Sequence, residues 1–156
     1  MKKLLACLFC ASVLLAGCGG SDGDAAAVKT GEGTATTESH GDTLTTTAKV
    51  ELDGDKFTKV EIDETYKTDK GEETTKKTLG EKYDMKSTSA KMGKIEGGAE
   101  WFEQVKFLED YIVANGVDGI ELGEDGKATN EDVLTGCTIN IKPYVEAVKA
   151  AKDSAK

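Results

Sequence analysis

The sequence predicts an α+β fold: a twisted antiparallel sheet, one long helix packed on it, and a short C-terminal helix. Two segments, residues 43–52 and 57–66, alternate between apolar and polar side chains, as half-buried strands do. Apolar residues recur at spacings of three and four between residues 99 and 115, which indicates an amphipathic helix. Pro143 then suits the first turn of a second helix, because proline has no N–H that would need a partner there.

The two predicted strands form a hairpin. Asp53-Gly54-Asp55 supplies the turn, since an Asp-Gly pair favours a tight hairpin connection. One face of the first strand carries Leu44, Thr46, Ala48, Val50 and Leu52. Val60 and Ile62 anchor the second strand. The segment 67–77 that follows is dense in charge and Thr, so we expect an exposed loop or an irregular strand extension.

Both predicted helices carry an apolar stripe. The long helix runs from Ala99 to Asn115, with Gly116 at its C-terminal cap. Its stripe is Trp101, Val105, Leu108 and Ile112, and that of the second helix, Pro143 to Lys152, is Tyr144, Val148 and Ala151. Trp101 has two interpretations, a core side chain or a ring that stacks on a cofactor; a position at the start of a core helix favours the first.

The N-terminus is typical of a bacterial lipoprotein. Lys2 and Lys3 precede an apolar run to Leu15, which is too short to span a membrane and matches a signal peptide over residues 1–17. Leu15-Ala16-Gly17-Cys18 is a lipobox, so we expect cleavage before Cys18 and lipidation of its thiol. This predicts a chain anchored in the cell membrane through lipid, on the extracytoplasmic face.

Residues 18–42 are expected to be a flexible tether, because Gly, Ala, Thr and Asp bury too little apolar surface to offset chain entropy. Near Gly31 to Thr36 the chain could already be entering a strand. His40 has no neighbouring His or Cys, which favours a solvated loop residue over a metal ligand. The folded domain is therefore predicted to span residues 43–156.

Composition limits the partners. Cleavage of 17 of the 156 residues leaves 139, a length that suits one domain. It also removes two of the 20 basic residues, so the mature chain has 18 basic and 29 acidic residues and a net charge of −11. This acidity predicts no nucleic-acid partner. The acidic residues between Glu121 and Asp132 do not follow the spacing of an EF-hand, so we expect a solvated loop and no metal site.

One stretch, Asp132 to Val148, carries a candidate site. Thr138 follows a hydroxyl-rich turn at Gly136 and precedes a helix N-terminus, whose free N–H groups and positive dipole end suit a phosphate. Cys137 is expected to be the one thiol left after processing and lipidation, and as a lone Cys it is interpreted as a small buried hydrophobe rather than a reactive group.

This stretch resembles the FMN-binding domain family, which includes the C subunit of sodium-pumping NADH:quinone oxidoreductases and flavin lipoproteins of extracellular electron transfer. The family pattern is Asp-x-x-Ser/Thr-Gly-Ala-Thr/Ser-x-Thr, and it is matched by Asp132, Thr135, Gly136 and Thr138. The resemblance implies that a flavin transferase attaches FMN through its phosphate to the Thr138 hydroxyl, and that redox partner proteins exchange electrons with the flavin.

Two positions depart from that pattern: Cys137 stands in place of Ala, and Asn140 in place of the second Thr. Two other segments, Leu79 to Lys86 and Glu100 to Gln104, resemble poorly characterised lipoproteins of Gram-positive anaerobes, a divergent branch of the same superfamily. In that branch the segment at Gly136 is often degenerate.

Three functions follow as expectations. The first is a flavin-carrying lipoprotein for electron transfer, in which Thr138→Ala abolishes covalent flavin and leaves the fold intact. The second is a flavin-free relative that serves as a binding or structural lipoprotein of the cell envelope. The third, a hydrolytic or solute-binding lipoprotein, is disfavoured, because no Ser/His/Asp grouping appears and the chain is short for a cleft between domains.

Overall fold

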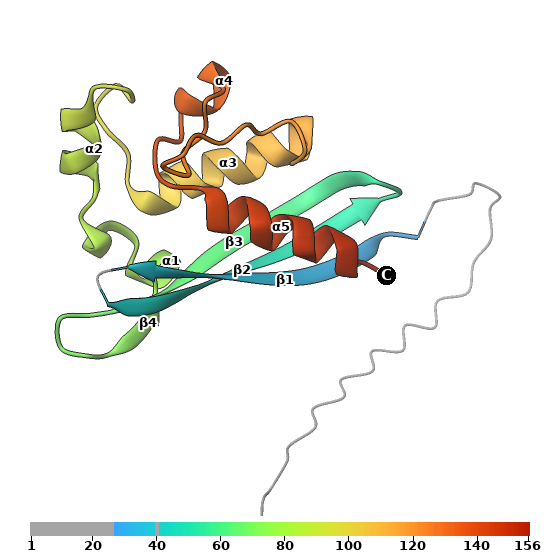
Figure 1. Cartoon of the computed structure of the whole chain (residues 1–156), viewed down its shortest axis with the longest axis horizontal. Coiled ribbons are helices and arrows are strands. Elements are labelled where there is room, and N and C mark those ends of the chain that lie inside the picture. The colour runs from blue at the N-terminus through green and yellow to red at the C-terminus, as the bar shows by residue number, and fades with distance from the viewer. Residues whose placement is uncertain (1–26, 40) are drawn as a thin grey trace, which may run out of the picture.

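A computed structural model describes residues 27–39 and 41–156. Its mixture of sheet and helices confirms the α+β class (Figure 1). In chain order the elements are β1 (Lys29–Ser39), β2 (Asp42–Asp53), β3 (Lys56–Lys67), β4 (Glu73–Thr75), α1 (Lys76–Leu79), η1 (Gly80–Tyr83), α2 (Lys86–Met92), α3 (Trp101–Asn115), α4 (Glu131–Leu134) and α5 (Lys142–Ser154).

The sheet is antiparallel, with its four strands in the order β1-β2-β3-β4. The predicted hairpin is confirmed as β2 and β3, and Gly54 takes the positive φ of 62° that its tight turn requires. A bulge at Glu51 and Leu52 shifts the register near that turn. All five predicted inward positions of β2 are buried or half-buried, so the alternation in the sequence identified the correct face.

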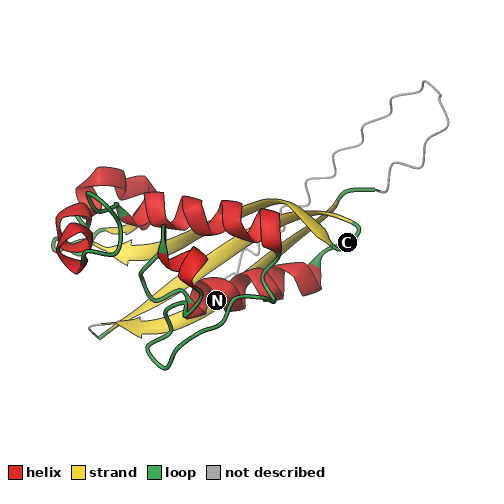
Figure 2. Ribbon diagram, turned by 90° about the horizontal axis from the view of Figure 1, so that it is seen from above, coloured by secondary structure: helices red, strands yellow, loops and turns green. Residues whose placement is uncertain are grey.

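Helices cover one face of the sheet (Figures 1 and 2). α3 lies on β3, and α5 lies on β1 and β2. The core between them contains both predicted helical stripes: Trp101, Val105, Leu108 and Ile112 from α3, and Tyr144, Val148 and Ala151 from α5. The opposite face, with side chains such as Thr34, Thr47 and Lys49, is exposed and polar.

The predicted lengths of the helices need a correction. α3 has 15 residues and α5 has 13, so the sheet carries two helices of similar length rather than one long and one short. α3 begins with a capping box: the Glu100 carboxylate accepts the backbone N–H of Glu103, and the Glu103 carboxylate accepts the backbone N–H of Glu100. The helix ends at Gly116 as expected. Pro143 lies in the first turn of α5, where its lack of an N–H costs nothing.

The predicted tether is wrong for residues 29–39, which form β1. Residues 31–36, for which the sequence left entry into a strand open, lie within β1, and Gly31 and Gly33 let the backbone of α5 approach it. A Cβ atom on Gly31 would lie 1.9 Å from the carbonyl oxygen of Ala151, and one on Gly33 would lie 2.2 Å from that of Ala147. The folded domain therefore begins at about Lys29 instead of residue 43.

Several predictions fall outside the described residues. They are the signal peptide 1–17, lipidation of Cys18, the first part of the tether, and the role of His40. Within the part of the chain that is described, no helix is both long and apolar enough to cross a bilayer.

Candidate functional site

The predicted site lies in α4 and the turn after it. The N–H groups of Gly136 and Cys137 both donate to the carbonyl of Val133, at 3.2 and 2.9 Å. The Thr135 hydroxyl donates to the carbonyl of Asp132 at 2.6 Å. These bonds wind the segment tightly, so Asp132 and Thr135 lie together at its exposed side. The Asp132 carboxylate also accepts the Tyr111 hydroxyl of α3 at 3.0 Å.

Thr138 is not part of that exposed group. It is 4% exposed, and both its N–H and its hydroxyl donate to Oε1 of Gln104, at 2.9 and 3.2 Å. Gln104 is itself 1% exposed, and its amide nitrogen donates to the carbonyl of Ala99 at 3.2 Å. The hydroxyl predicted to carry FMN therefore points into the domain and links the turn to α3. Transfer of a phosphate group requires a hydroxyl that the transferase can reach from solvent. In this arrangement the Thr138 hydroxyl is not exposed to solvent.

Gly136 has a packing role. A Cβ atom there would lie 2.3 Å from the ring of Phe107 on α3, closer than side-chain contacts allow. The absence of a side chain therefore lets the turn rest on an aromatic ring. The contact with Phe107 explains why this position holds a glycine, and no bound phosphate is needed to explain it.

The N-terminus of α5 is filled by the chain's own acceptors. The N–H groups of Ile141 and Lys142 donate to the carbonyl of Gly126 at 2.9 and 3.1 Å, and that of Lys142 also reaches Oδ1 of Asn140 at 3.0 Å. Pro143 has no N–H to offer. The prediction of free N–H donors for a phosphate is therefore wrong for these residues. Asn140, one of the two departures from the family pattern, supplies one of the acceptors.

The second departure, Cys137, is 1% exposed. Burial raises the pKa of its thiol to about 12, so the sulfur stays protonated at physiological pH. This confirms the prediction of a small buried hydrophobe.

A buried polar network lies in the same core, close to the segment that follows Thr138. The Trp101 indole N–H donates to the Tyr144 hydroxyl at 2.9 Å, and that hydroxyl donates to Glu64 at 3.2 Å. Lys76 forms an ion pair with the same carboxylate, and its ammonium lies 5.2 Å from the centre of the Tyr83 ring. The core interpretation of Trp101 is confirmed, with 2% of its surface exposed. Burial, assisted by the charge of Glu64, raises the pKa of Tyr144.

Sequence reasoning missed the charged members of this network. Lys76 was placed in an exposed segment, yet it is 7% exposed. Glu64 could have been found, because it shares the inward parity of Val60 and Ile62 on β3. A cavity of about 250 Å³ adjoins the network between β1, β2 and the start of α5. Because each of its buried polar atoms has a hydrogen-bond partner, the network is complete without a ligand.

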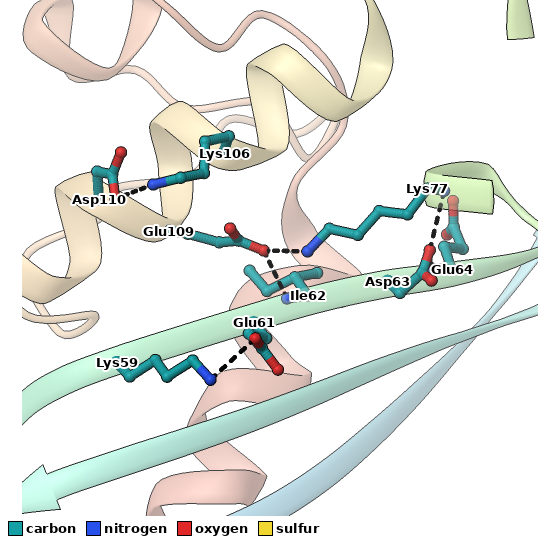
Figure 3. Close-up of polar contacts among 9 residues, drawn as sticks. All are labelled: Lys59, Glu61, Ile62, Asp63, Glu64, Lys77, Lys106, Glu109 and Asp110. Carbon is teal, nitrogen blue, oxygen red and sulfur yellow. Dashed lines mark hydrogen bonds and ion pairs between the residues drawn. The ribbon is translucent and has the colours of Figure 1, made fainter. Parts of the chain in front are cut away.

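A second buried carboxylate fastens α1 to the sheet (Figure 3). Glu109 of α3 accepts the N–H of Ile62 at 2.7 Å and the ammonium of Lys77 at 2.6 Å. The N–H of Lys77 donates to Asp63 at 3.2 Å. Consecutive lysines of α1 thus pair with Glu64 on β3 and with Glu109 on α3, which satisfies both buried charges. Their role is structural.

Metal binding finds no support in the described ranges, where no group of three or more His, Cys, Asp or Glu side chains could hold an ion. Comparison with known proteins adds no family: no family model, no curated protein and no solved structure matches this chain.

Proposed function

We propose that this chain is a lipid-anchored extracytoplasmic protein whose domain works without covalent flavin, as a binding or structural module of the cell envelope. One observation carries the flavin-free assignment: the Thr138 hydroxyl is buried and donates to Gln104. In that position the hydroxyl helps to hold the turn against α3 through its hydrogen bond to Gln104. Esterification would break that bond and require a path for a phosphate into the core.

The membrane anchor rests on the N-terminal sequence. Lys2 and Lys3, the apolar run and the small residues before Cys18 together form a lipoprotein signal. We expect Cys18→Ala to release the protein from the membrane fraction and to abolish labelling with palmitate. If the variant stays in the membrane fraction, the anchor assignment fails.

The rival proposal is a flavin carrier served by a flavin transferase and redox partner proteins. It is favoured by the four matching positions of the motif, Asp132, Thr135, Gly136 and Thr138, which occupy one short segment. For this function the turn must open, so that Thr138 leaves Gln104 and reaches the transferase. FMN would then supply the redox chemistry.

Intact mass decides between the two proposals. Residues 19–156, which contain every described helix and strand, are produced together with a flavin transferase, with Thr138→Ala as the matched control. A flavin-free domain has the mass of the unmodified chain in both samples. An increase of one FMN less one water in the native chain alone would overturn the proposal and establish the carrier.

A further inference from the structure

β1 is an edge strand that is protected over only part of its length. At its start, the N–H and carbonyl of Thr30 bond to the backbone of Lys156, both at 3.3 Å. The Ser154 hydroxyl donates to the carbonyl of Glu32 at 2.8 Å and accepts the Glu32 N–H at 3.1 Å. The end of α5 therefore closes the edge at these two residues (Figure 1).

The same edge is open from Thr34 to Glu38. Because the backbone groups of alternate residues point to the same side of a strand, those of Thr34, Thr36 and Glu38 point outward, as those of Thr30 and Glu32 do. Within the described residues, no hydrogen bond reaches these outward backbone groups. The segment Thr-Ala-Thr-Thr-Glu contains neither Pro nor Lys, the residues that usually guard an edge.

We propose that this open edge pairs with the same edge of a second copy of the chain, antiparallel about Thr36. Thr36 then lies opposite Thr36 of the second copy and exchanges both backbone hydrogen bonds with it. Thr34 lies opposite Glu38 of the second copy in the same way. The two four-stranded sheets join into one continuous sheet with the helices of both copies on the same face.

The charges favour a second copy as the occupant. In this register Glu38, the single charge of the segment, meets Thr34 rather than another carboxylate. On the helix side, α5 runs antiparallel to β1, since Ala151 lies at Gly31 and Ala147 at Gly33. The first turn of α5 is therefore nearest the two-fold axis.

That first turn carries an ion pair between Lys142 and Glu146, 4.0 Å apart, which is made within one chain. The edge is thus self-complementary in its backbone groups, and the register places no two carboxylates of the segment opposite each other. This inference is independent of whether the domain carries flavin.

The test is sedimentation equilibrium of residues 19–156 over a concentration series. The wild type is expected to form dimers, and Thr36→Pro is expected to weaken dimerisation by about tenfold or more, because proline removes the outward N–H. Thr36→Val, which keeps the N–H and the strand, should dimerise like the wild type. Proline is tolerated where the N–H of an edge strand faces outward, and circular dichroism checks that the variant is folded.

A wild type that remains monomeric throughout the series would overturn the proposal. So would a dimer that Thr36→Pro leaves unchanged.

Discussion

Gly33→Ala tests the packing of α5 on β1. The added Cβ would lie 2.2 Å from the carbonyl oxygen of Ala147 and 2.3 Å from the N–H nitrogen of Ala151. Both are backbone atoms of a helix, so no side-chain rotation relieves the contact. To restore ordinary contact at 3.4 Å, α5 must move by about 1.2 Å, and Val148 and Tyr144 move with it.

Overpacking of this kind costs about 1–3 kcal/mol, and sometimes more. We expect the upper end, about 3 kcal/mol, because the clash involves the main chain of two elements. Alanine offsets about 0.5–1 kcal/mol of this, since it is more favourable than glycine within a strand. The net loss of about 2 kcal/mol corresponds to a fall in Tm of roughly 5–10 °C for a domain of this size.

Thermal unfolding followed by the fluorescence of Trp101, the single tryptophan, measures this effect. Gly119→Ala is the matched control, because Gly119 has open space around its Cβ position and no positive φ. The control should change Tm by no more than about 2 °C. If Gly33→Ala behaves like the control, α5 does not lie on the backbone of β1, and the account of the two glycines is refuted.

Three further predictions concern the buried residues. Gly136→Ala should destabilise the domain by about 1–3 kcal/mol through the Phe107 ring, and Phe107→Ala in the same chain should recover part of that loss in a double-mutant cycle; additive losses would contradict the contact. Glu64→Gln should cost about 3–5 kcal/mol in urea unfolding, because it leaves the buried ammonium of Lys76 without its partner, and adding Lys76→Met should recover stability. Cys137 should not react with a thiol reagent at pH 8 until the chain unfolds. Because burial raises its pKa from 9.0 to about 12, the folded chain keeps a proton that the unfolded chain releases, so this contribution to stability falls as pH rises from 9.0 toward 12; rapid labelling of the folded chain would contradict it.

Periodicity predicted much of the fold. The alternation of β2 and β3 and the stripes of α3 and α5 each follow from burying one face of a regular element. β1 was predicted only as a possible strand entry near residues 31–36, and the rest of it was assigned to the tether, because its composition resembles that of a linker. Its two glycines at Gly31 and Gly33 are compatible with a tether and with a close helix–strand contact, and only the position of α5 distinguishes the two.

The candidate site was harder to predict, since a short motif gives residue types but not their exposure. Thr138 matches the flavin pattern by type, but Gln104, 34 positions earlier in the chain, accepts its hydroxyl. Glu64 and Lys76 were missed for a related reason: charged residues are usually exposed, and burial becomes favourable only when a distant partner is in place.

Native-state hydrogen exchange at the amide of Thr138, measured by NMR, tests the central claim most directly. A buried N–H bonded to Gln104 at 2.9 Å should exchange only when the domain unfolds, at a rate close to those of the α3 and β2 core. Exchange at the rate of an exposed turn would mean that Thr138 is open in solution. The hydroxyl would then be available to a flavin transferase, which contradicts the flavin-free account.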